Sequence, residues 1–149
     1  MFRPDFITET RITCGVALSS KKRLLEALAR LLASEHPGLN PDTVFERLLE
    51  RERLGSTGLG HGIALPHARV KEVKEALGAF VSTVKGVDYD AMDGEPVDLA
   101  FALLVPESAT EEHLQLLAQL AGLFSDPRVR KRLRDAESAD AILRVFVTP

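Results

Sequence analysis

Residues 51–69, with the sequence RERLGSTGLGHGIALPHAR, join a helical first part of the chain to a strand-rich middle part. Four glycines fall between Gly55 and Gly62, which is too many for the interior of a helix or a strand, so this part is predicted to be a loop. The following run, 63–66, is predicted to be extended because a proline disfavours helical geometry in the residue before it. The stretch therefore predicts a loop and then a short apolar strand that presents His67 at its end.

Two helices are predicted before this stretch. Leucines recur at helical spacing over 24–32, directly after Ser19 and Ser20, either of which could cap the helix. Asn40 and Pro41 predict the start of a second helix, running to about Arg53, because asparagine caps well and proline fits the first helical position.

Strands are predicted on both sides of the second helix. The segments 77–84 and 97–105 are rich in β-branched and aromatic residues, as expected of buried strands, and an early strand is predicted over 12–16. The turn between the two later strands is predicted at 92–96, which reads MDGEP.

The last third of the chain is again helical in pattern. Ser108 and Glu111 have the spacing of a capping box, and Asp126 and Ser138 are predicted to cap two further helices. The predicted buried face of the first of these helices consists of Leu114, Leu117, Ala118, Ala121 and Phe124. This order of elements favours an α/β fold, a three-layer sandwich with a mixed, roughly five-stranded sheet and helices on both faces, in a single domain over residues 1–149.

Composition excludes several classes of protein. A net charge of −3 is not that of a typical nucleic-acid-binding domain, and the basic run 128–134 is interpreted as a solvated helix face rather than a docking patch. No apolar run reaches the roughly 18 residues of a membrane span, so the chain is expected not to be membrane-inserted. Cys14 is the only cysteine, which excludes an intramolecular disulfide and favours a cytoplasmic location.

The glycine-rich loop is not a nucleotide-binding loop. It lacks the Gly-Lys-Ser/Thr ending of a P-loop and the G-x-G-x-x-G spacing of a dinucleotide site. Its glycines can nevertheless expose backbone N–H groups to an anion, and Ser56 and Thr57 add hydroxyl donors. We therefore predict that Ser56, Thr57 and Gly58 bind phosphate.

His67 follows the loop and is a usable nucleophile, because an ordinary imidazole is largely neutral at about pH 7. Arg51 and Arg69 could each offer a planar cation to a phosphoryl group. Simpler interpretations exist for all of these residues: a glycine-rich stretch can be a plain turn, and Arg51 suits a helix C-terminus electrostatically. A metal site made of His61, His67 and His113 is conceivable, but their spacing matches no compact ligand motif, and we expect no metal and no cofactor.

The run GSTGLGHGIALPHAR resembles the active-site segment of the phosphotransferase-system IIA family, which includes fructose, mannitol and nitrogen-regulatory members (EIIA type 2). The RERLGSTG lead-in, the later stretch EEHLQLLAQLAGLF and the chain length extend the resemblance over nearly the whole sequence, and GIALPH is its most specific part. The loop is most similar to that of the nitrogen-regulatory members. The family fold, a mixed five-stranded sheet between helical layers, agrees with the pattern described above.

This resemblance implies a role for three residues. His67 would accept a phosphoryl group, on Nε2, from an HPr-like phosphohistidine carrier protein. Arg51 would stabilise charge, and His113, expected in the first turn of a helix where the dipole disfavours a protonated ring, would donate an N–H to the phosphoryl group. The protein would thus be a phosphotransferase component with a phosphohistidine intermediate, whether or not it is classed as an enzyme.

Three functions remain open at this point. The first is a nitrogen-regulatory IIA protein whose phosphorylation changes its binding to regulatory target proteins. The second is the IIA component of a fructose- or mannitol-type sugar permease, which passes phosphate to a IIB domain. The third is a binding module that has lost the chemistry, against which the presence of His67, His113 and Arg51 argues.

Overall fold

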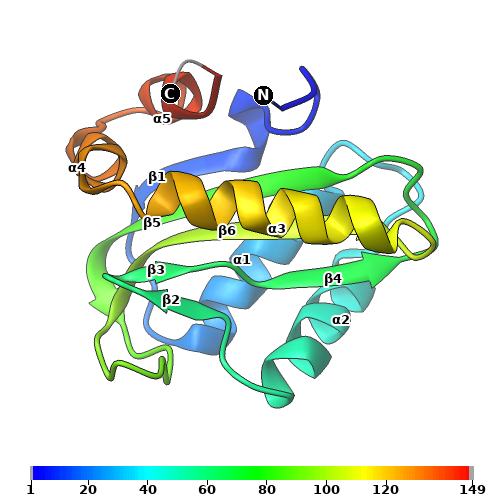
Figure 1. The fold of residues 1–149 in the computed structure, drawn as a ribbon. Coiled ribbons are helices and arrows are strands. Elements are labelled where there is room, and N and C mark those ends of the chain that lie inside the picture. The colour runs from blue at the N-terminus through cyan, green and yellow to red at the C-terminus, as the bar shows by residue number, and fades with distance from the viewer. Residues whose placement is uncertain (1, 148–149) are drawn as a thin grey trace.

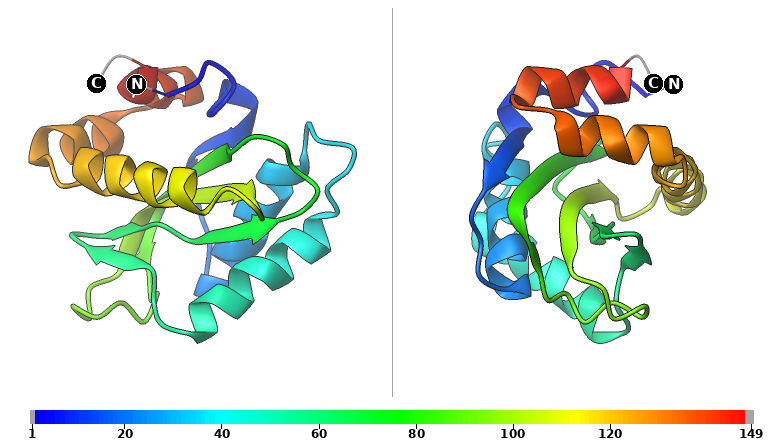
Figure 2. Two further views of the ribbon diagram at one scale, coloured as in Figure 1. Left: turned by 45° about the vertical axis from the view of Figure 1, so that its right-hand side comes forward. Right: turned by 90° about the vertical axis from the view of Figure 1, so that its left-hand side faces the viewer.

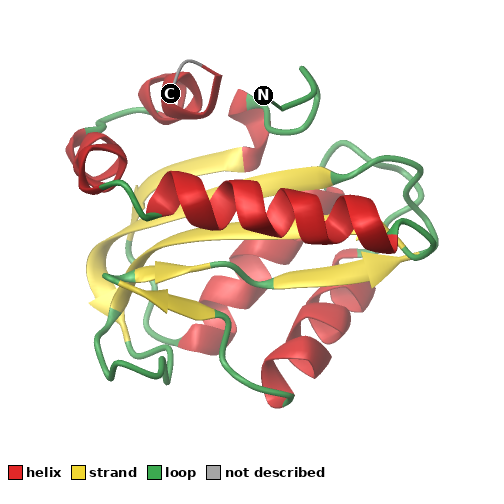
Figure 3. Cartoon of the chain, in the orientation of Figure 1, coloured by secondary structure: helices red, strands yellow, loops and turns green. Residues whose placement is uncertain are grey.

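The computed structural model describes residues 2–147, in which five α-helices surround a mixed sheet of six strands (Figures 1 and 3). The strands are β1 (Ile12–Val16), β2 (Gly58–Gly60), β3 (Ile63–Ala64), β4 (His67–Val70), β5 (Leu77–Val87) and β6 (Val97–Pro106). The helices are α1 (Lys21–Ala33), α2 (Pro41–Arg53), α3 (Thr110–Phe124), α4 (Pro127–Asp135) and α5 (Ala139–Val147). The predicted α/β fold is confirmed, with six strands rather than about five.

The sheet is centred on β6. One edge of β6 pairs antiparallel with β5, which in turn pairs parallel with β1. The other edge pairs parallel with both β3 and β4, and β2 lies outside β3. Helices α1 and α2 cover one face of this sheet and α3 covers the other, so the predicted three layers are present (Figures 1 and 2).

Strands β3 and β4 are two parts of one extended run along β6. Ile63 lies beside Leu99 and His67 beside Leu103, so the register is unchanged across the break between the two strands. Pro66, which has no N–H to donate, stands in the break, and its carbonyl still accepts a hydrogen bond from the N–H of Leu103 at 2.9 Å. His67 is therefore the first residue of a second strand, and not, as predicted, the residue at the end of a strand.

The prediction that 55–62 contains no strand was also wrong. Gly58–Gly60 forms β2, which pairs antiparallel with β3. The turn between them requires positive φ at two successive residues, His61 at 57° and Gly62 at 79°. Glycine adopts such angles without strain, so here a glycine contributes to a hairpin instead of preventing one.

Four of the five predicted helix starts are confirmed. The Ser20 hydroxyl and the Asn40 side chain each accept a backbone N–H at the start of α1 and α2, as Asp126 and Ser138 do for α4 and α5. The capping box at Ser108 was wrong: Ser108 lies within a turn closed by a hydrogen bond from the N–H of Ala109 to the carbonyl of Pro106. Helix α3 consequently begins at Thr110 without a side-chain cap.

The predicted buried face of α3 was only partly right: Phe124 is buried and Leu117 packs against the core, but Leu114 and Ala118 are exposed. Its buried residues are Leu120, Leu123 and Phe124, whereas Leu114 is 64% exposed. The helix is apolar on nearly every side, so spacing alone does not identify the side that packs on the sheet. Leu114 instead lies at the mouth of the cavity described below.

The core consists of two apolar layers, one on each face of the sheet. Along β6, Leu99, Phe101 and Leu103 pack in the layer under α3, while Ala100 and Ala102 pack in the layer under α1 and α2. This alternation is the two-residue period of a strand buried on both faces.

The basic run on α4 is largely neutralised by acidic side chains. Arg128, Lys131 and Arg134 form ion pairs with Asp126, Asp135 and Asp98, respectively. Within residues 2–147, no helix is both long enough and apolar enough to cross a bilayer.

Candidate active site

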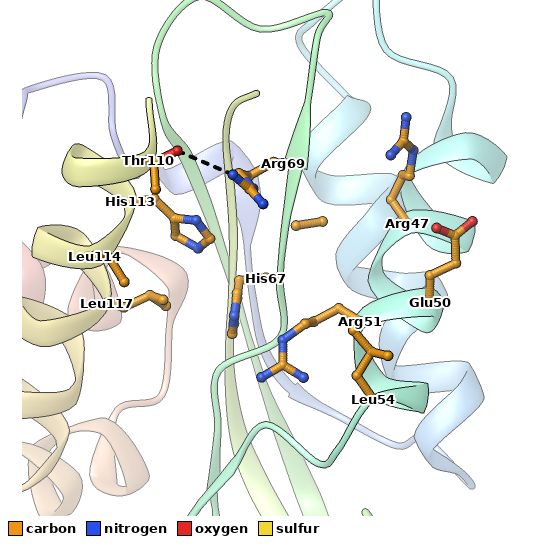
Figure 4. A pocket seen from close by; sticks show the side chains of 11 residues that line it. Arg47, Glu50, Arg51, Leu54, His67, Arg69, Thr110, His113, Leu114 and Leu117 are labelled. Carbon is orange, nitrogen blue, oxygen red and sulfur yellow. Dashed lines mark hydrogen bonds between the residues drawn. The ribbon is translucent and has the colours of Figure 1, made fainter. Parts of the chain in front are cut away.

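An open cavity of about 460 Å³ lies where β4, α2 and α3 meet (Figure 4). Two histidines and three arginines line it, although they come from three separate segments of the sequence. The lining residues are Arg47, Glu50, Arg51, Leu54, His67, Ala68, Arg69, Thr110, His113, Leu114 and Leu117. The structure thus brings together His67, His113 and Arg51, the three residues for which the family resemblance implies a role in the chemistry.

His67 is half-buried at the start of β4, and a backbone contact fixes its ring. Its Nδ1 lies 2.8 Å from the carbonyl oxygen of Leu65. A carbonyl can only accept a hydrogen bond, so Nδ1 carries the proton and donates it. In the neutral ring this leaves the lone pair on Nε2.

Burial lowers the pKa of His67 below its ordinary value of 6.5, and the positive charge of Arg51 lowers it further. The contact with the Leu65 carbonyl and the negative charge of Glu52 act in the opposite direction but are weaker than the burial. The His67 imidazole is therefore neutral near pH 7 and has a free nitrogen lone pair.

His113 faces His67 from the first turn of α3. The two ring centroids are 5.3 Å apart and the rings are tilted by 69°. Burial lowers the pKa of His113, and the nearby His67, Arg69 and Arg51 lower it further, so this ring too is neutral. Its Nε2 atom is buried and has no hydrogen-bond partner. A buried polar atom without a partner is uncommon in a folded protein, and beside the free lone pair of His67 it is suited to bind a ligand.

The cavity has positive charge from two sides. Arg51, in the last turn of α2, donates a hydrogen bond from Nη1 to the carbonyl of Gly55 at 3.0 Å and extends toward His67 (Figure 4). Arg69, on β4, donates a hydrogen bond to the hydroxyl of Thr110 at 3.3 Å.

The structure does not bring Ser56, Thr57 or Gly58 into the cavity lining. The N–H and the hydroxyl of Thr57 both donate to the buried carboxylate of Glu52. The N–H of Gly58 donates to the hydroxyl of Ser56 at 3.1 Å. These donors are engaged within the loop, so the role of the three residues in phosphate binding stays a prediction.

Glu52, to which no role was assigned from the sequence, holds this loop in place. The carboxylate of Glu52 also forms an ion pair with Lys21 at 2.9 Å, and the hydroxyl of Tyr89 lies 3.0 Å from that of Thr57. A sequence signal was available: Glu52 follows Val44 and Leu48 at intervals of four residues, which places it on the buried face of α2.

His61 lies outside this cavity and is exposed, and its carbonyl accepts a hydrogen bond from Arg134. Among residues 2–147, no three His, Cys, Asp or Glu side chains are placed to hold a metal ion together. The cavity thus combines a neutral imidazole with arginines and one unpartnered ring nitrogen. These groups can attack an electrophilic phosphorus atom and bind its oxygens.

The sequence matches the family described as "Phosphoenolpyruvate-dependent sugar phosphotransferase system, EIIA 2" over residues 5–148. It is 48% identical over 143 residues to a nitrogen regulatory protein of Pseudomonas aeruginosa, an alignment that covers 96% of this chain and 93% of the relative. The crystal structure of nitrogen regulatory protein IIA-Ntr from Neisseria meningitidis superposes with a TM-score of 0.89 at 46% identity, covering 95% of this chain and 96% of that one. A fructose-specific EIIABC component of Bacillus subtilis is 33% identical over 95% of this chain, which corresponds to 22% of that longer protein.

Proposed function

The chain belongs to the EIIA 2 family of the phosphoenolpyruvate-dependent sugar phosphotransferase system, and from this premise we propose that it is a nitrogen-regulatory phosphocarrier in which His67 carries the phosphoryl group. The observation that carries the proposal is the fixed ring of His67, with Nδ1 bound to the Leu65 carbonyl and Nε2 free. The nitrogen-regulatory assignment is supported by the 48% and 46% identities to proteins of that description.

The proposed reaction moves one phosphoryl group between two imidazoles. Nε2 of His67 attacks the phosphorus of a phosphohistidine on an HPr-like donor. As the new N–P bond forms, the bond to the donor nitrogen breaks and its electron pair returns to the donor ring. The transition state is loose, with negative charge on the three equatorial oxygens, so the protein contributes mainly position and charge. The Nδ1–H bond to Leu65 stabilises the positive charge that His67 gains on attack.

Two cavity residues are proposed to stabilise the transferred group. Nε2 of His113 has no hydrogen-bond partner in the protein. In the tautomer with the ring hydrogen on Nε2, it would donate a hydrogen bond to one phosphoryl oxygen. Arg51 would contribute its permanent charge from α2. Neither residue needs to move far, because both already line the same cavity as His67.

Phosphorylation would then act as a signal. It adds a charge of about −1.5 to −2 to a cavity that holds arginines, at a mouth flanked by the exposed side chains of Leu54 and Leu114. Such a change can alter the affinity for a partner protein that docks over the mouth. We propose that these partners are regulatory target proteins. We further propose that residues 1–149 form a single domain, and that the protein is located in the cytoplasm, in keeping with the lone Cys14.

The decisive experiment is an intact-mass measurement after incubation with phosphoenolpyruvate and a phosphocarrier mixture. We expect the wild-type chain to gain one phosphoryl group that is lost in acid, as is typical of phosphohistidine, and His67→Ala to gain none. Phosphate that survives acid would point to a serine such as Ser56, and phosphate uptake by His67→Ala would show that another residue is the acceptor.

The alternative function is that of a sugar-permease component. The 33% identity to a fructose-specific EIIABC component favours it. A transfer assay separates the two functions: if the phosphorylated protein hands its phosphoryl group to a sugar-specific IIB domain and drives sugar uptake, the permease function is correct and the regulatory one is not.

A further inference from the structure

Arg69 lies in the cavity without a role in the reaction described above. We propose that Arg69 binds the phosphoryl group once it is attached to His67 and thereby stabilises the phosphorylated form of the protein. This inference rests on the proposed function of His67. It assigns to Arg69 a different task from that of Arg51, because the two arginines reach the cavity from different elements.

The geometry of β4 places Arg69 on the same face as His67. Successive side chains of a strand point to opposite faces, so residues two apart share a face. Ala68, between them, and Val70 pack in the apolar layer under α1 and α2. His67 and Arg69 therefore both point toward α3, where His113 and Thr110 lie (Figure 4).

Arg69 is held only weakly by the hydrogen bond that it forms in the structure. Its only described hydrogen bond goes to the neutral hydroxyl of Thr110 at the long distance of 3.3 Å, and among residues 2–147 no acidic side chain forms an ion pair with it. Elsewhere in the chain, Arg128 and Arg134 are each held by an aspartate. An exposed guanidinium held only by a hydroxyl can change partner readily, and a phosphoryl group is the stronger acceptor.

The charge of Arg69 already acts on this site, since it contributes to the lowered pKa of His113. A guanidinium can bind two phosphoryl oxygens at once through its planar pair of N–H groups. With Arg69 and His113 on the α3 side and Arg51 on the α2 side, the phosphoryl group would have donors from three elements. Because Arg69 would bind the product of the transfer, its loss should affect the phosphorylated state more than the fold.

The test compares four variants with the wild type. Arg69→Ala removes the charge, Arg69→Lys keeps the charge without the fork, and Thr110→Val removes only the present partner. Arg30→Ala, on the exposed side of α1 and away from the cavity lining, is the control for a change of one unit in net charge. Two quantities are measured for each: the equilibrium constant of phosphoryl exchange with the phosphorylated carrier, and the pH midpoint of the phosphorus NMR signal of the phosphohistidine.

We expect Arg69→Ala to shift the exchange equilibrium about tenfold toward the carrier, the magnitude of one charge-assisted hydrogen bond. The phosphorus signal should titrate at higher pH, because a phosphoryl group without its cation binds a proton more tightly. For Arg69→Lys, both quantities should lie between those of the wild type and of Arg69→Ala. Thr110→Val should keep the wild-type exchange equilibrium.

Two results would overturn the inference. In the first, the wild type is phosphorylated on His67 but Arg69→Ala leaves both quantities unchanged. In the second, Thr110→Val reproduces the effect of Arg69→Ala, which would mean that Arg69 acts only by linking β4 to α3. If instead the wild-type protein gains no acid-labile phosphate, or if His67→Ala still gains it, the proposed function itself has failed, and this is visible before any Arg69 variant is measured.

Discussion

Replacing the buried Glu52 by glutamine is expected to lower the free energy of unfolding by about 4 kcal/mol. The Glu52 side chain is 2% exposed, and its carboxylate binds the ammonium of Lys21 at 2.9 Å. It also accepts the N–H of Thr57 at 3.2 Å and the Thr57 hydroxyl. One carboxylate thereby joins α1, the end of α2 and the loop that leads to β2.

The magnitude follows from what glutamine can and cannot replace. Removing one member of a buried ion pair destabilises by about 3–5 kcal/mol, because the remaining charge has no partner. Here the lower value applies, since Lys21 is 24% exposed and its ammonium stays 4.3 Å from the centroid of the Tyr89 ring. The amide oxygen of glutamine can still accept the Thr57 hydroxyl, but the amide nitrogen cannot accept the Thr57 N–H, which adds about 1 kcal/mol.

Urea denaturation followed by circular dichroism measures this change. Glu52→Gln, Lys21→Met and the double variant form a cycle in which a coupling of about 1–3 kcal/mol is expected for side chains in direct contact. Lys22→Met, an exposed lysine on the same helix, is the matched control and should change stability by less than about 0.5 kcal/mol. A coupling near zero, or a loss for Glu52→Gln no larger than that of the control, would refute the argument that this ion pair holds the loop.

Three further predictions concern the site and the core. Stability should fall as pH drops below 6.5, because burial lowers the pKa of His67 in the folded protein and the unfolded chain then binds a proton first; His67→Gln should reduce this loss in urea titrations between pH 7 and 5. His113→Ala should slow phosphorylation of His67 about 100-fold in a rapid-quench assay while leaving the site of phosphorylation unchanged, and an unaltered rate would remove His113 from the mechanism. Gly78→Ala should destabilise by about 2–3 kcal/mol, since the added Cβ would clash with Cζ of the buried Phe101. Gly122→Ala on α3, with open space around it, should stabilise by about 0.5–1 kcal/mol, and equal melting temperatures for the two variants would contradict this.

The sequence predicted those elements whose signals are local. Asn40 with Pro41 marked the start of α2 because a cap and a proline act within a single turn, and Asp126 with Pro127 did the same for α4. The buried side of α3 was not predictable in this way, because leucines and alanines occur around the whole helix. Which of them is buried depends on how α3 lies on the sheet, and that is decided by the packing of distant residues such as Phe101.

The site was also predicted only in part, because the contacts of the loop side chains, like the packing of α3, depend on residues that the local sequence does not identify. His67, His113 and Arg51 followed from the resemblance to a family, and the structure places them in one cavity. The loop residues Ser56 and Thr57 were assigned to phosphate from their chemistry alone. In the structure Thr57 donates to Glu52 and the Ser56 hydroxyl accepts the N–H of Gly58, and sequence alone does not indicate which partner a hydroxyl will have.

The interruption of the strand at Pro66 connects the fold to the chemistry. A regular strand over 63–70 would direct backbone carbonyls to neighbouring strands, but at the interruption the carbonyl of Leu65 accepts from Nδ1 of His67, two residues later. This bond keeps the ring proton on Nδ1, leaves the lone pair on Nε2 and holds the ring at the sheet edge, with its centroid 5.3 Å from that of His113 on α3. Burial of the ring then keeps it neutral. The proposed nucleophile would thus be prepared by one backbone carbonyl beside the break at Pro66 and by the packing around its ring, without a separate general base.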